Sequence, residues 1–167
     1  RFEHPRCVLA GELDGPYDIV LLSCKAYDLD SALEAIAPAI GTSTGVLPLL
    51  NGLDHLDALA DRFGPEHVLG GMCMISAVRE DDGTIHHLNQ LHRVAYGELD
   101  GSRSARVRGI EQDFQRARFV SQPSDDVLQE MWEKWVLIAT VAGATCLMRA
   151  TIGDIVASGG RDFILQL

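Results

Sequence analysis

The sequence predicts an α/β fold, in which a parallel sheet with helical crossovers is followed by the start of an all-helical part. Three short apolar runs alternate with two amphipathic segments between residues 17 and 78. These runs are continuously apolar, as is typical of strands covered on both faces. Beyond residue 125 no run has the composition of a strand. We therefore predict a boundary there, between residues 1–124 and residues 125–167.

Each element has its own signal in the chain. Asp28 or Asp30 is suited to cap the first helix at its N-terminus, and Gly64 closes the second helix. Strands separated by helices at this spacing indicate parallel pairing through right-handed crossovers. The predicted elements are, in order, strands over 18–24, 44–52 and 66–78 with helices over 28–40 and 53–64 between them, a hairpin over 83–101, a helix over 104–117, a strand over 118–124, a long helix over 125–149 and a further helix over 150–158.

Composition excludes several kinds of partner. The 167 residues carry a formal net charge of −10, whereas nucleic acid and anionic membranes bind basic surfaces, so we expect neither as a partner. The apolar run from Trp135 to Met148 is shorter than the roughly 20 residues that span a bilayer. The cysteines form no CxxC pair, which favours a reducing cytoplasm over a disulfide framework or a zinc site. They are Cys7, Cys24, Cys73 and Cys146.

Two polar residues follow consecutive predicted strands. Lys25 ends the first strand, and Asn51 ends the second one, before Gly52. Ligands of open α/β sheets bind at the carboxyl ends of the strands, and a glycine there lets the backbone approach a ligand closely. The simpler interpretations are a solvated loop lysine and an Asn-Gly turn. Together the two residues predict a cleft for an anionic, hydrogen-bonding ligand.

Lys134 stands at the mouth of an apolar helix, between Trp132 and Trp135. One interpretation is a surface salt bridge to Glu130, four residues earlier in the favourable order. The other is a partly desolvated ammonium whose pKa is lowered into the range of a general acid. The sequence leaves both open.

Other catalytic patterns are absent from the sequence. His86, His87, His92 and His55 have no metal-ligand spacing, so we expect no metal site. No GxSxG elbow, GxGxxG turn or GxxxxGK[ST] loop is present.

The ordered runs "DIVLLSCKAYD", "NGLDHLD", "GELDG" and "MWEKWV" resemble the ketopantoate reductases (2-dehydropantoate 2-reductases) over nearly the whole chain. This resemblance implies an NADPH-binding Rossmann-like domain and a helical domain, with the active site between them. It implies reduction of ketopantoate, on the route to pantothenate. The family's catalytic lysine falls on Lys134 as general acid, and its cofactor-side residues fall on Lys25, Asn51 and Ala77. Asn51 would also contact substrate.

Departures from the family pattern shape the remaining expectations. The glycine-rich fingerprint would precede Arg1, and the distal part of the helical domain would follow Leu167, so we expect a fragment with an incomplete Rossmann-like sheet. The family's asparagines one and two turns after the lysine are here Ile138 and Ala142, so a different 2-oxo acid is an alternative substrate. A non-catalytic module is a second alternative. Truncation would expose sheet edges, which predicts a homo-oligomer.

Overall fold

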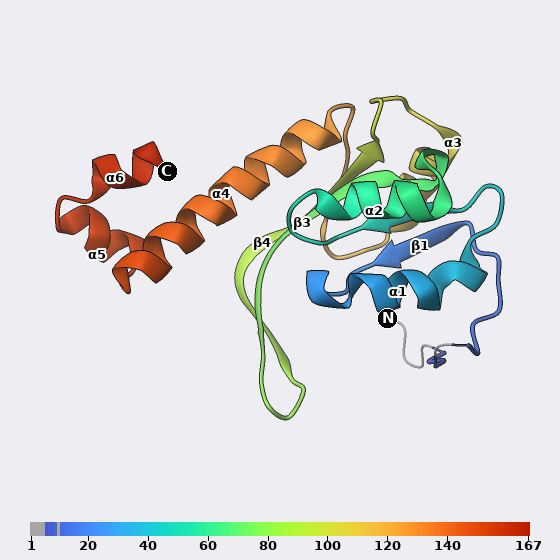
Figure 1. Ribbon diagram of the computed structural model, residues 1–167, viewed down its shortest axis with the longest axis horizontal. Coiled ribbons are helices and arrows are strands. Elements are labelled where there is room, and N and C mark those ends of the chain that lie inside the picture. Colours follow the sequence, from blue (N-terminus) through green and yellow to red (C-terminus); the bar gives the residue numbers. More distant parts are fainter. Residues whose placement is uncertain (1–5, 10) are drawn as a thin grey trace.

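The computed structural model describes residues 6–9 and 11–167, so Arg1 lies outside the described residues. Figure 1 shows a body of strands and helices from which a two-stranded ribbon and the long helix α4 project in different directions. The elements are β1 (Ile19–Leu22), η1 (Ala26–Asp28), α1 (Leu29–Ile36), η2 (Ala37–Ala39), β2 (Gly45–Pro48), α2 (Asp54–Phe63), η3 (Pro65–His67), β3 (Leu69–Arg79), β4 (Ile85–Glu98), α3 (Ala105–Phe114), β5 (Val120–Pro123), α4 (Val127–Met148), α5 (Ile152–Ala157) and α6 (Arg161–Gln166).

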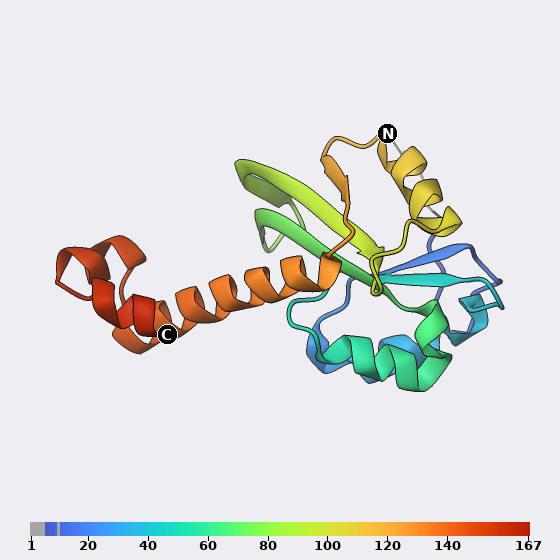
Figure 2. The ribbon, with the colours of Figure 1, turned by 90° about the horizontal axis from the view of Figure 1, so that it is seen from above.

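Strands β1 and β2 form a parallel pair that is covered by helices on both faces. Figure 2 shows α1 and α2 on one side of the pair and α3 on the other. Val46 of β2 packs with Leu59 of α2, whereas the next residue, Leu47, packs with Val107 and Ile110 of α3. Both faces of the strand are therefore buried, which is why its sequence is continuously apolar. The predicted α/β class is confirmed.

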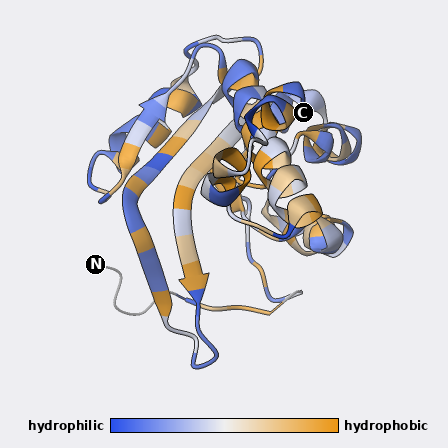
Figure 3. Cartoon of the chain, turned by 90° about the vertical axis from the view of Figure 1, so that its left-hand side faces the viewer, coloured by the Kyte–Doolittle hydropathy of each residue, from blue (hydrophilic) through white to orange (hydrophobic). Residues whose placement is uncertain are grey.

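The predicted hairpin over residues 83–101 is wrong in its pairing. This run forms one long strand, β4, which pairs antiparallel with β3. The turn lies earlier in the chain, where Gly83 adopts φ +87° and Glu80 N–H donates to the Thr84 carbonyl at 2.8 Å. Figure 3 shows alternating hydrophilic and hydrophobic bands along β4, the pattern of a strand that extends from the body. A single isolated parallel bridge joins Val46 of β2 to Val68, the residue just before β3.

The second sheet, β3–β4–β5, ends with strand β5, which directly precedes the helices α4 to α6. Strand β5 pairs parallel with β4, so that Arg93 lies beside Val120. Helix α3, which precedes β5, is capped by Ser104, whose hydroxyl accepts a hydrogen bond from Val107 N–H at 3.2 Å. Helix α4 begins just after β5, packs on β3 and β4 with its first turns, and reaches α5 and α6 at its far end. Among the described residues, none of the helices is long and apolar enough to cross a membrane.

Candidate functional site

The structure brings Lys25 and Asn51 to the same edge of the sheet. Leu22 pairs with Pro48 at the last rung of the β1–β2 ladder, and Leu49 N–H donates to the Leu22 carbonyl at 2.8 Å. Lys25 and Asn51 each follow this rung by three residues, so the two parallel strands deliver them to equivalent positions. Both side chains are exposed. Both are therefore open to solvent at the carboxyl edge, where ligands of open α/β sheets bind, although only Asn51 lines the groove described below.

The turn after Asn51 touches the helix that carries Lys134. Gly52 has φ +83°, a conformation that glycine adopts without strain. A Cβ atom at Gly52 would lie 3.9 Å from the ring of Trp135, in ordinary van der Waals contact. The strand-end loop and α4 thus meet one residue away from Lys134.

A groove of about 780 Å³ opens beside this contact. The side chain of His55 is buried at its wall, and its Nε2 has no hydrogen-bond partner among the described residues. Burial lowers the pKa of His55, because the charged imidazolium loses hydration there. The groove is lined by Ala26, Leu29, the segment from Leu50 to Asp57, Leu128, Trp132 and Trp135.

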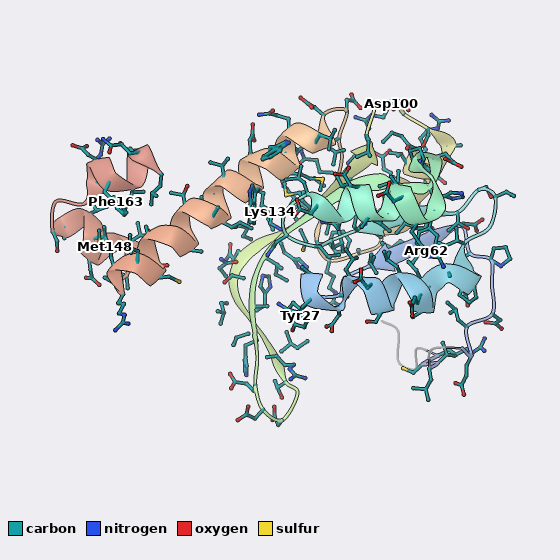
Figure 4. The ribbon with its side chains drawn as sticks, viewed as in Figure 1. Tyr27, Arg62, Asp100, Lys134, Met148 and Phe163 are labelled. Atoms are coloured by element: carbon teal, nitrogen blue, oxygen red, sulfur yellow. The ribbon has the colours of Figure 1, made fainter. Side chains whose placement is uncertain are left out.

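Lys134 is half-buried where α4 crosses the β3–β4 ribbon, as Figure 4 shows. Burial lowers the pKa of its ammonium group below the usual lysine value, and the charge of the Cys73 thiolate opposes that shift to a smaller extent. The side chain lines a second cavity, of about 180 Å³, beside Met72 and Met74 of β3. In the described part of the chain the Lys134 side chain makes no hydrogen bond or salt bridge. It is thus a cation without a carboxylate partner.

The carboxylate expected as its partner is engaged elsewhere. Arg93 Nη2 donates to Glu130 Oε2 at 2.8 Å, and Gln122 Nε2 donates to Glu130 Oε1 at 3.3 Å. Arg93 Nη1 in turn donates to Gln122 Oε1 at 2.8 Å. The surface salt bridge between Glu130 and Lys134, which the sequence left open, is therefore not formed.

The predicted residues do not share one cavity. Glu130, Lys134 and Leu137 lie on one face of α4 and line the smaller cavity, whereas Trp132 and Trp135 lie on the neighbouring face and line the groove. Asn51 belongs to the groove, so it is separated from the Lys134 side chain by the edge of α4.

The remaining predicted positions lie along β3 and α4. Ala77 is exposed and pairs with His87, just beyond a bulge between Ile75 and Ala77. Ile138 is half-buried and Ala142 exposed on the helix after Lys134. The Thr145 hydroxyl, on the next turn of the helix, donates to the Val141 carbonyl of its own helix at 2.7 Å.

Sequence reasoning did not select Arg93. It stands in a β-rich run, and nothing local indicates that β4 comes to lie beside α4.

Within the described residues, no three His, Cys, Asp or Glu side chains gather as metal ligands.

The sequence and the fold of this chain are similar to those of known proteins. A model of the family described as "Ketopantoate reductase PanE/ApbA" matches residues 2–101. An oxidoreductase of Bacillus subtilis (strain 168) is 35% identical over 154 residues, which is 92% of this chain and 50% of the relative. The crystal structure of 2-dehydropantoate 2-reductase from Geobacter metallireducens GS-15 superposes with a TM-score of 0.80 at 30% identity. That match covers 90% of this chain and 50% of the reductase.

A more distant neighbour acts on a different substrate. The ternary structure of D-mandelate dehydrogenase with NADH and anilino(oxo)acetate superposes with a TM-score of 0.72 at 25% identity, over 85% of this chain and 46% of that enzyme. The chain spans about half the length of the relatives it matches. The family match covers more than half of the chain, from residue 2 to residue 101, and the fold agrees with it. The chain therefore belongs to the ketopantoate reductase family.

Proposed function

We propose that this chain is part of an NADPH-dependent reductase that converts a 2-oxo acid, first of all ketopantoate, to the corresponding 2-hydroxy acid. Lys134 is the general acid. The observation that carries the proposal is the state of Lys134, a half-buried ammonium beside a cavity, with no carboxylate partner in the described residues. Family membership supports the reaction class.

Lys134 has two roles in the proposed reaction. Its ammonium polarises the ketone by donating a hydrogen bond to the carbonyl oxygen, and it transfers the proton to that oxygen as a hydride reaches the carbonyl carbon. The lysine is left as a neutral amine, which regains a proton from solvent. Burial favours the neutral amine and so makes the ammonium a stronger acid, closer to the pKa that suits catalysis near neutral pH.

The residues at the sheet edge fit the nicotinamide end of a dinucleotide. A nicotinamide cofactor supplies the hydride when it is bound. The exposed Lys25 ammonium would bind ribose or phosphate oxygens, and the Asn51 amide would hold the nicotinamide ribose or the substrate. Gly52, with φ +83°, adds no side chain to the turn beside Asn51, and the Trp135 ring lies against the position that a Cβ atom would take. Ser76, which precedes Ala77, has no pairing partner at the bulge in the β3–β4 ladder, so its backbone groups would be available to a ligand beside Ala77.

A second candidate function is reduction of a bulkier, less polar 2-oxo acid. Ile138 and Ala142 offer apolar surface where the resemblance implies asparagines, and a loss of hydrogen-bonding groups changes substrate preference strongly. The similarity to D-mandelate dehydrogenase supports this candidate, and it makes NADH the alternative cofactor.

The test is a cofactor-oxidation assay on a full-length protein that contains this chain. Ketopantoate, benzoylformate and a short aliphatic 2-oxo acid are each offered with NADPH and with NADH. Turnover of ketopantoate with NADPH supports the first candidate. Turnover of benzoylformate alone supports the second candidate, and a folded protein that turns over none of the substrates contradicts both.

A further inference from the structure

We infer that Arg93 is a positioning residue for Lys134, because it holds the Glu130 carboxylate away from the lysine ammonium. This inference rests on the proposed function for its catalytic meaning, but its structural content is independent of any substrate. It concerns three side chains from three elements: Arg93 of β4, Gln122 of β5 and Glu130 of α4.

The three side chains form a closed network. Arg93 uses one guanidinium nitrogen for Gln122 and the other for Glu130, both at 2.8 Å. Gln122 reaches the second carboxylate oxygen at 3.3 Å, so both oxygens of Glu130 are bonded. The Glu130 side chain is only 18% exposed and that of Arg93 31%, so solvent screens this pair less than an ordinary surface pair.

Without Arg93, Glu130 would have a different partner within reach. Glu130 precedes Lys134 by four residues on the same helix, which is the favourable order for a Glu–Lys pair. Both side chains line the same cavity. Such a pair would stabilise the charged ammonium and weaken it as a proton donor. By keeping Glu130 from the ammonium, the Arg93 network leaves Lys134 the stronger proton donor.

The other groups around Lys134 do not replace this effect. The charge interaction with Cys73 on β3 raises the pKa of Lys134 by less than burial lowers it. Glu133 also lines the cavity, but Gln129 Nε2 donates to its Oε1 at 3.1 Å on the outer surface of α4. Glu130 is thus the carboxylate whose release would matter most.

The sequence makes a direct test simple, because Lys25 and Lys134 are its only lysines. Reductive methylation with ¹³C-formaldehyde gives two lysine signals, which a Lys25→Arg variant assigns. The pH titration of the Lys134 signal is then followed by NMR in wild type, in Arg93→Met and in the double variant Arg93→Met/Glu130→Gln. Circular dichroism checks that each variant is folded.

We expect Arg93→Met to move the Lys134 titration midpoint upward by about 1 pH unit, because the freed Glu130 turns to the ammonium. Adding Glu130→Gln should remove that upward shift. Arg79→Met, a matched change of an exposed arginine on β3, should leave the midpoint unchanged. An unchanged midpoint in Arg93→Met, or an upward shift that survives Glu130→Gln, would overturn the inference.

Two further measurements keep the inference testable on its own. If Arg93→Met does not fold, Arg93→Gln retains polar contacts but loses the charge, and it should still raise the midpoint; no rise would overturn the inference. The cofactor-oxidation assay is run on a full-length protein that contains this chain and carries the same substitutions. A shifted midpoint in the 167-residue chain, together with no turnover in the folded full-length protein, supports the network and contradicts the proposed function. Turnover with no midpoint shift contradicts the network alone.

Discussion

The ring of Trp135 lies 3.9 Å from the point that a Cβ atom on Gly52 would occupy. This contact ties the turn after β2 to the helix that carries Lys134. The contact between Gly52 and Trp135 thus fixes the position of the Asn51–Gly52 turn relative to Lys134, the general acid of the proposed reaction.

Gly52→Ala should destabilise the protein by about 1 kcal/mol, because a side chain at φ +83° is strained even where space is available. It should also raise KM for the cofactor, since Asn51 is the neighbouring residue. Gly83→Ala is the matched control, because Gly83 has φ +87° and open space around it in a turn far from the site. Urea unfolding and steady-state kinetics should show similar stability losses for both variants and a kinetic effect for Gly52→Ala alone. An equal kinetic effect in both variants would contradict the coupling.

Lys134→Met should stabilise the protein at neutral pH by about 1 kcal/mol, because it removes a half-buried charge with no carboxylate partner in the described residues. Below the lowered pKa both the folded and unfolded states carry the proton, and the full cost of burying the charge applies. As pH rises through that pKa toward 10.5, the folded state loses its proton first and the cost fades. The stability advantage of Lys134→Met over wild type should therefore shrink with rising pH in this window. An advantage that does not vary with pH, measured by urea unfolding, would show that burial does not lower this pKa.

His55→Leu should also stabilise the protein, by about 1 kcal/mol, because it replaces an imidazole whose Nε2 is buried without a partner in the described residues. The pKa of His55 is lowered by burial, so wild-type stability falls as pH drops through 6.5 toward the folded value, where the unfolded chain binds the extra proton. That loss should be smaller in the variant. His67→Leu is the control and should destabilise, since the His67 Nδ1 is hydrogen-bonded to the Thr44 carbonyl at 2.7 Å. Stabilisation by both variants would mean that side-chain volume, rather than the unpaired nitrogen, decides the effect.

The chain should form homo-oligomers. Within the described residues β1 pairs with β2 alone, and Leu21 of β1 is 52% exposed. Free strand edges and exposed apolar side chains favour pairing with a second copy. Sedimentation at micromolar concentration should give a mass of at least twice 18.2 kDa, and Leu21→Lys should lower it. A clean monomer for the unchanged 167-residue chain would contradict this prediction.

The sequence was most informative where structure is local. Continuous apolar runs predicted β1 and β2, amphipathic spacing predicted α1 and α2, and a longer apolar run predicted α4. Parallel pairing predicted that Lys25 and Asn51 lie at one edge of the sheet. The sequence failed where distant segments decide the outcome. The polar residues within 83–101 suggested a turn inside this run. The turn instead lies at Gly83, and the whole run pairs with β3.

The same limit applies at the site. The spacing of Glu130 and Lys134 on one helix favours their salt bridge, and only the arrival of β4 beside α4 shows that Arg93 takes the carboxylate instead. No periodicity along the chain encodes that contact, because it joins residues 37 positions apart.

The most direct test of the central claim is the turnover of Lys134→Ala in a full-length protein that contains this chain, with the best 2-oxo acid from the panel. Removing a general acid should lower kcat by ~10²-fold or more. Lys25→Ala is the control, and it should act mainly on KM for the cofactor. A kcat for Lys134→Ala within a few-fold of wild type would contradict the assignment of Lys134 as the proton donor.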